Sequence, residues 1–256
     1  MEKCVLRQDK RWRSRLTGLL IGVVAWILVA GAGSEVLGAP DTLTQDFRLW
    51  APVFFTAPIS QSFIGYAEVN PRLGDDVSDL NQLILRTAIG YKLNDQWSIW
   101  QGYAWNTVYD NADNKDDFTG EHRIYQQLTY RDKFEFLEAF PFIKIQSRTR
   151  LEERWIDHAH GTALRPRTML RMDVPLPQLP DWSFVTFDEI FVNLNGVGGG
   201  PEAGFDQNRW FIGFNRQFTK QINIDFGYQM QIINTRKENM LNQLNNCIMI
   251  NFFINL

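Results

Sequence analysis

Apolar residues recur at every second position along most of this chain, and this period of two constrains the fold more than any other feature. Such a period places alternate side chains on the two faces of a β-strand, whereas a helix repeats about every 3.6 residues. In the stretch QINIDFGYQMQIINT (221–235), Ile222, Ile224 and Phe226 point to one side and Asn223 and Asp225 to the other. The alternation predicts an all-β fold whose strands each have one apolar and one polar face.

Eleven stretches of the chain carry this pattern. They lie near residues 45–56, 61–71, 82–93, 96–108, 121–131, 141–156, 164–175, 182–194, 206–216, 221–234 and 246–256. Most have about ten to fourteen residues, which is nearer to the length of a strand that crosses a membrane than to the soluble norm of about five or six.

A soluble β-sandwich or lipocalin-like barrel is the alternative, and it would bury one face of each strand in a water-free core. The polar faces of this chain carry too many charged side chains for such a core. Aromatic residues also lie near the ends of the apolar faces, where membrane barrels have interfacial girdles. These residues are Tyr91, Trp97, Trp105, Tyr130, Trp155, Trp182 and Trp210. The sequence therefore predicts a transmembrane, antiparallel, up-and-down β-barrel.

The number of strands follows from the connections between them. Long connections at 72–81, 109–120, 157–163, 195–205 and 235–245 alternate with shorter ones. This alternation is typical of outer-membrane barrels, but eleven strands would conflict with the even counts of bacterial single-chain barrels. We therefore predict twelve strands, one of them unrecognised, or ten if residues 45–56 do not cross the membrane.

The N-terminal region has the order of a secretory signal peptide. The basic stretch MEKCVLRQDKRWRSR is followed by the uncharged LTGLLIGVVAWILVAGA and then by small residues. We interpret residues 1–39 as the signal peptide and residues 40–256 as the barrel; an uncleaved inner-membrane anchor is the alternative. The predicted location is the bacterial outer membrane.

Charge narrows the range of partners. The formal charge is −3, and the segment 1–39 contains six basic and three acidic residues, so the mature chain would carry −6. A mildly acidic exported protein is not expected to bind nucleic acid. The predicted partners are the lipid bilayer with its lipopolysaccharide, the outer-membrane assembly machinery and small anionic solutes.

Positive charge is concentrated on the polar faces of the strands. The predicted basic track consists of Arg86, Arg123, Arg148, Arg150, Arg154, Arg165, Arg167, Arg171 and Arg209. Fewer acidic residues are expected beside it, namely Glu121, Glu152, Asp173, Glu189 and Asp225. Two interpretations remain open. The arginines either pair with carboxylates in a lattice that fills the lumen, or they form a narrow channel that passes anionic solutes.

An enzyme is not predicted. A membrane-embedded hydrolase would need a nucleophile beside a histidine, and Ser147 and Ser183 have no histidine at a suitable spacing. The sequence DHAHG (157–161) has two histidines, but two histidines in an exposed loop are usually only polar groups. We therefore predict no cofactor and no metal site, with the hydrolase as a remote alternative.

Several stretches together resemble an uncharacterised bacterial family, domain of unknown function 2490. They are QDFRLWAPV, RLEERW, RPRTMLRM, DEIFVNLN and FDQNRWFIGF, and the resemblance covers roughly residues 45–256. The family is grouped with outer-membrane barrels, so the resemblance implies the fold and adds no chemistry.

Overall fold

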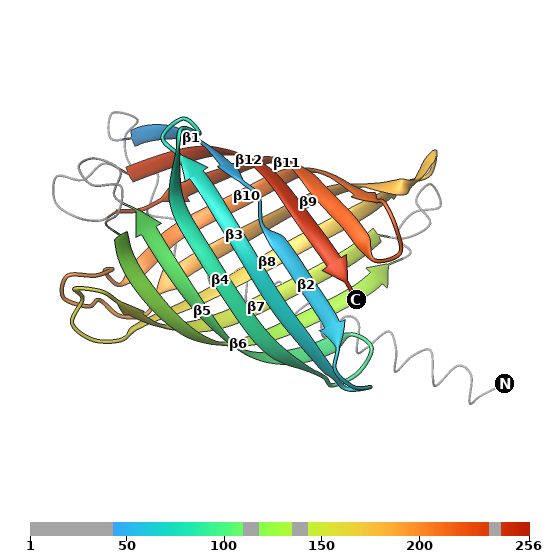
Figure 1. Cartoon of the computed structure of the whole chain (residues 1–256), viewed down its shortest axis with the longest axis horizontal. Helices are drawn as coiled ribbons and strands as arrows, with labels where there is room; N and C mark the ends of the chain where they lie inside the picture. The colour runs from blue at the N-terminus through green and yellow to red at the C-terminus, as the bar shows by residue number, and fades with distance from the viewer. Residues whose placement is uncertain (1–42, 110–117, 135–142, 236–241) are drawn as a thin grey trace.

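The strands of the protein form one twelve-stranded sheet that closes into a barrel (Figure 1). The computed structural model describes residues 43–109, 118–134, 143–235 and 242–256. Within them no helix is long and apolar enough to cross a membrane. The predicted signal peptide, 1–39, lies outside the described residues. The strands are β1 (Leu43–Trp50), β2 (Val53–Pro58), β3 (Phe63–Gly74), β4 (Asp79–Lys92), β5 (Trp97–Tyr109), β6 (Phe118–Phe134), β7 (Ile143–Ile156), β8 (Ala163–Leu176), β9 (Leu179–Asn193), β10 (Gly204–Gln217), β11 (Ile222–Ile233) and β12 (Asn242–Asn255).

The barrel closes between the two ends of the described chain. From β2 to β12 each strand pairs antiparallel with the next, but both β1 and β2 pair parallel with β12. Thr44 lies opposite Gln243 and Val53 opposite Phe252, so the register continues without a shift from β1 into β2. The Phe252 amide, which donates to the carbonyl oxygen of Pro52 at 2.9 Å, bridges the break.

β1 and β2 therefore act as one interrupted strand, and the barrel wall has eleven strand positions. The break falls at Pro52, which has no N–H to donate to a ladder. The predicted strand 45–56 is this composite strand, and the total of twelve arises only because it is divided. The prediction of a wholly antiparallel barrel is wrong at the closure, and the alternative of ten strands is also wrong.

The connections fall at two ends of the barrel. One end has the connections 75–78, 157–162 and 194–203 together with the start of β1, and the other has the short turns and the chain end at Leu256. The predicted long loop 72–81 is wrong, because β3 and β4 extend to a four-residue turn at 75–78. The Asp46 carboxylate accepts hydrogen bonds from the backbone of Asp75 and Asp76 in this turn.

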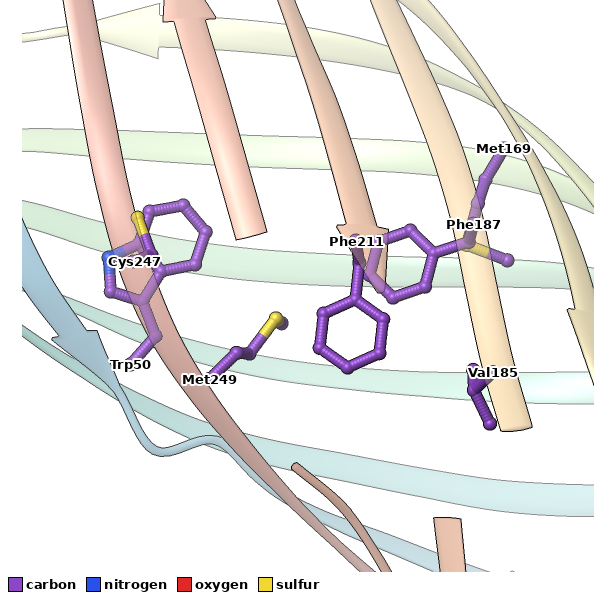
Figure 2. Packing of buried hydrophobic residues seen from close by; sticks show 7 residues of the cluster. All are labelled: Trp50, Met169, Val185, Phe187, Phe211, Cys247 and Met249. Carbon is purple, nitrogen blue, oxygen red and sulfur yellow. The ribbon is translucent and has the colours of Figure 1, made fainter. Parts of the chain in front are cut away.

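The two surfaces of the wall are the reverse of those of a soluble barrel. The outer surface carries exposed apolar side chains such as Ile89, Ile99 and Phe214, whereas Glu152 and Asp225 are buried inside. The interior also has an apolar patch (Figure 2), formed by Trp50, Met169, Val185, Phe187, Phe211, Cys247 and Met249. The lumen is thus polar with one apolar side.

Candidate functional site

A cavity of about 570 Å³ occupies one half of the barrel, toward the end at which the chain terminates at Leu256. Its lining runs from Trp50 and Arg209 in the middle of the wall to Lys220 and Asn255 at the mouth. Lys220 and Asn255 are exposed, so the mouth faces solvent. We call this cavity the chamber.

The lining of the chamber is strongly basic. Ten basic side chains and three acidic side chains line it. The basic residues are Arg72, Arg86, Arg131, Lys144, Arg148, Arg150, Arg167, Arg171, Arg209 and Lys220, and the acidic residues are Glu68, Asp173 and Glu189. Like charges gathered in a cleft with low-dielectric walls attract counter-ions, so the chamber should concentrate anions.

Two neighbouring strands supply most of the arginines that the sequence singled out. The structure places Arg148, Arg150 and Arg154 on β7 and Arg165, Arg167 and Arg171 on β8, all facing the interior. Arg150 pairs directly with Arg167 across the two strands, and Glu152 pairs with Arg165. Like charges directly opposite each other destabilise a sheet, so the repulsion between Arg150 and Arg167 must be offset by nearby negative charge.

Glu152 and Glu189 supply that compensation for part of the cluster. Glu152 accepts hydrogen bonds from Arg165 at 2.7 and 3.0 Å and from Arg167 at 3.0 Å. Glu189 accepts two from Arg167, both at 2.9 Å, and one from Arg148 at 2.7 Å. These charge-assisted bonds between planar groups are the strong kind, and they fix the three arginines in place.

The remaining predicted acidic residues also lie beside arginines. Glu121 accepts from Arg123 at 2.7 Å and from Arg154 at 2.5 Å. Asp173 and Asp225 both accept from Arg171, at 2.6 and 2.5 Å. Arg86 pairs with Glu68. Much of the predicted basic track is therefore paired, as in the lattice interpretation.

Four arginines of the chamber have no carboxylate hydrogen-bonded to them within the described residues: Arg72, Arg131, Arg150 and Arg209. Their hydrogen bonds go to side-chain amides, with Arg150 donating to Gln127 at 2.6 and 3.0 Å. The nearest acid oxygen to Arg150 is 3.7 Å away, on Glu152.

Aromatic rings support three of these guanidinium groups, those of Arg72, Arg150 and Arg209. Arg72 lies 3.8 Å and Arg209 5.0 Å from the centre of the Trp50 ring, and Arg150 lies 4.0 Å from that of Tyr125. Stacking of this kind stabilises a cation without cancelling its charge. Arg150 is only 3% exposed, and its buried Nη1 has no hydrogen-bond partner. These three guanidinium groups therefore carry positive charge that no hydrogen-bonded carboxylate neutralises.

Arg72 was absent from the residues predicted from the sequence. The predicted strand 61–71 ends three residues before the observed end of β3 at Gly74, so Arg72 fell into the supposed loop. Its alternation with Glu68 and Asn70, which also face the interior, was the available signal.

A layer of buried polar side chains separates the chamber from a second cavity of about 320 Å³ at the other end. Along β7 the order is Arg150 in the chamber, Glu152 in the layer and Arg154 in the second cavity. We call this layer the septum; its residues, which line neither cavity and are all buried, are Asn106, Glu121, Arg123, Glu152, Arg165, Gln207, Gln231 and Asn245.

Hydrogen bonds connect the members of the septum across several strands. Asn245 on β12 donates to Gln231, which donates to Gln207 at 2.5 Å. Gln207 donates to Asp206, which also accepts from Arg165 at 2.7 Å. The septum is therefore a bonded layer rather than a set of separate side chains.

An aromatic strip lines the chamber on the side away from β7. Ring centres are 4.9 Å apart between Phe253 and Phe54, 6.4 Å between Phe54 and Tyr66, and 6.4 Å between Tyr66 and Trp100. The strip crosses β12, β2, β3 and β5, and its four side chains are half-buried. The alternation alone did not predict it, because these positions share the inward parity of the charged residues.

The residues considered for hydrolysis and metal binding are apart from one another. His122 is on the outer wall, where its Nδ1 lies 2.6 Å from the hydroxyl of Tyr103. Ser183 lines the chamber, and no hydrogen bond among the described residues joins a serine to a histidine. His158 and His160 lie in the connection 157–162. The described part of the chain contains no group of three potential metal ligands.

Comparisons with known proteins identify relatives. A family model described as "Protein of unknown function (DUF2490)" matches residues 47–242. An uncharacterised protein of Methylorubrum extorquens is 32% identical over 235 residues, covering 91% of this chain and 96% of that protein.

Two solved structures are also similar. The translocator domain of autotransporter NalP from Neisseria meningitidis is 12% identical with a TM-score of 0.40, over 69% of this chain and 70% of that one. A bacterial polysaccharide outer membrane secretin is 11% identical with a TM-score of 0.35, over 73% of each chain.

Proposed function

This chain belongs to the family described as Protein of unknown function (DUF2490), and we propose that it is an outer-membrane β-barrel that acts as a narrow channel for small anions. The observation that carries the proposal is the chamber, with its ten basic and three acidic lining residues. A ring of one charge in a narrow bore sets the selectivity of a pore.

The distribution of side chains supports insertion in a membrane. The apolar outer surface suits lipid, and a closed barrel leaves no unpaired sheet edge in the hydrocarbon. Aromatic pairs occur toward both ends of the outer wall, with the ring centres of Phe63 and Tyr91 5.1 Å apart at one end and those of Trp105 and Phe118 6.2 Å apart at the other. Such pairs suit the two interfaces of a bilayer.

The outer membrane is the proposed location, because residues 1–39 have the order of a signal peptide. Lipopolysaccharide and the outer-membrane assembly machinery are the corresponding partners. Cell fractionation tests the location, and recovery of the protein in the inner membrane with residues 16–32 retained would contradict it.

We expect a current carried mainly by anions. In a planar bilayer with a KCl gradient, the reversal potential should indicate a preference for chloride over potassium. The substitution Arg150→Gln should reduce this preference, because the Arg150 guanidinium has no hydrogen-bonded carboxylate to cancel its charge. The matched control is Arg216→Gln, since Arg216 is exposed and lies against the rings of Trp182 and Phe218. Cation preference, or equal effects of the two substitutions, would contradict the channel.

The septum favours a second candidate, a plugged barrel whose arginines hold the lumen shut. To distinguish the two, Gln207→Ala and Gln231→Ala together would remove two of the four neutral side chains of the septum and keep its ion pairs. For a narrow channel we expect conductance to rise severalfold in the double variant. Silence of both the parent and this double variant would favour the plugged barrel.

A further inference from the structure

We propose that the chamber binds organic anions that combine a flat apolar ring with a carboxylate or phosphate group, in preference to inorganic anions. The inference rests on the proposed function only in that small anions enter the chamber. The inference specifies the chemical class of the solute, which the charge of the chamber alone does not determine.

The first argument is the position of charge in the outer part of the chamber. Arg131 on β6, Lys144 and Arg148 on β7, and Arg171 on β8 line one side of it. Arg148 is the least enclosed of the paired arginines, with 23% of its side chain exposed, and it donates a hydrogen bond to Glu189 at 2.7 Å. An oxyanion entering from the mouth would meet this side first.

The second argument is the aromatic strip on the other side. Phe253, Phe54, Tyr66 and Trp100 form a continuous row of rings at 4.9 to 6.4 Å spacing. A row of half-buried rings facing a polar cavity offers stacking surface to a flat molecule. Inorganic anions would leave this surface unused.

The third argument is the short distance between the two sides. The guanidinium carbon of Arg171 on β8 lies 5.9 Å from the centre of the Phe253 ring on β12. The two sides therefore approach each other there. Because Asp173 and Asp225 already bond Arg171, the charged substituent of a ring stacked on Phe253 would be bound by the other basic residues of that side, such as Arg148. The apolar patch of Figure 2 extends the ring-binding side inward through Trp50, Phe187 and Met249, which also line the chamber.

Binding by the purified full-length protein in detergent tests the inference, and calorimetry with five probes separates its parts. Phenyl phosphate and benzoate carry both features, inorganic phosphate and acetate carry charge alone, and benzyl alcohol carries the ring alone. We expect phenyl phosphate to bind at least tenfold more tightly than either inorganic phosphate or benzyl alcohol, and benzoate to bind more tightly than acetate. Equal affinities for phenyl phosphate and inorganic phosphate would overturn the inference.

A substitution locates the ring. Phe54→Leu should weaken binding of phenyl phosphate roughly fivefold and leave inorganic phosphate unchanged. The control is Phe55→Leu, because Phe55 is the next residue of β2 and faces the outer surface. Unchanged affinity in Phe54→Leu, with the fold intact by thermal unfolding, would contradict the aromatic strip as the site. This measurement needs no conduction, so a silent barrel that binds phenyl phosphate would refute the channel and retain the site.

Discussion

Replacing Glu152 by glutamine should destabilise the barrel by about 3–5 kcal/mol, the usual cost of removing one partner from a buried ion pair. Glu152 is 1% exposed and accepts hydrogen bonds from Arg165 and Arg167. Arg150 adds a third guanidinium at 3.7 Å. Glutamine keeps the volume, so the loss reports charge and hydrogen bonding rather than packing. The free energy of unfolding by urea in detergent measures it.

The neighbouring residue supplies the control. Glu153 faces outward on the same strand, and its carboxylate accepts a long hydrogen bond of 3.5 Å from Gln126. Glu153→Gln should therefore change the free energy of unfolding by less than about 0.5 kcal/mol. Adding Arg150→Gln to Glu152→Gln should restore part of the stability, because it removes the least compensated charge of the cluster. Equal effects of Glu152→Gln and Glu153→Gln would show that the arginine cluster does not depend on Glu152.

A cysteine at position 48 should form a disulfide with Cys247 under oxidising conditions. Arg48 and Cys247 are register partners in the parallel pair of β1 and β12, and Cys247 is a buried free thiol. Adjacent strands lie about 4.7–4.9 Å apart, within the Cα separation of about 4.4–6.8 Å that a disulfide needs. In the variant Arg48→Cys, with Cys4→Ser to remove the other thiol, mass spectrometry should find no free thiol.

The matched control for this cross-link is Asp46→Cys in the same background. Asp46 faces the same side of β1 but pairs with Asn245, two residues away from Cys247. Its thiol should stay free. A free thiol in Arg48→Cys, or cross-linking in both variants, would contradict the parallel closure.

The sequence predicted the wall of the barrel well because alternation is a local property. Every predicted strand overlaps an observed one, and the family resemblance is confirmed by the match over residues 47–242. The direction of the closing strand was not predictable in the same way. Alternation is identical for parallel and antiparallel neighbours, so nothing between 45 and 56 shows that this strand runs parallel to β12.

The sequence likewise predicted only part of the candidate site. Parity identified inward positions such as Arg150 and Glu152, but it does not tell which carboxylate reaches which guanidinium. The difference between Arg167, held by two glutamates, and Arg150, held by Gln127, depends on cross-strand register. The role of the basic track in selecting anions stays a prediction that the reversal-potential measurement will test.

The composite strand β1–β2 also has a consequence for the order of assembly. Every other neighbouring pair in the sheet is joined by a local connection, whereas the closure joins residues near 43 with residues near 242. Bringing such distant segments together has the largest loop-closure entropy, and distant pairings form slowly. We therefore expect the closure to be the rate-limiting step, with the edges of the composite strand β1–β2 and of β12 unpaired and prone to aggregation until then. Timing the Arg48→Cys disulfide against hairpin formation during refolding would show a lag, and its absence would refute this order.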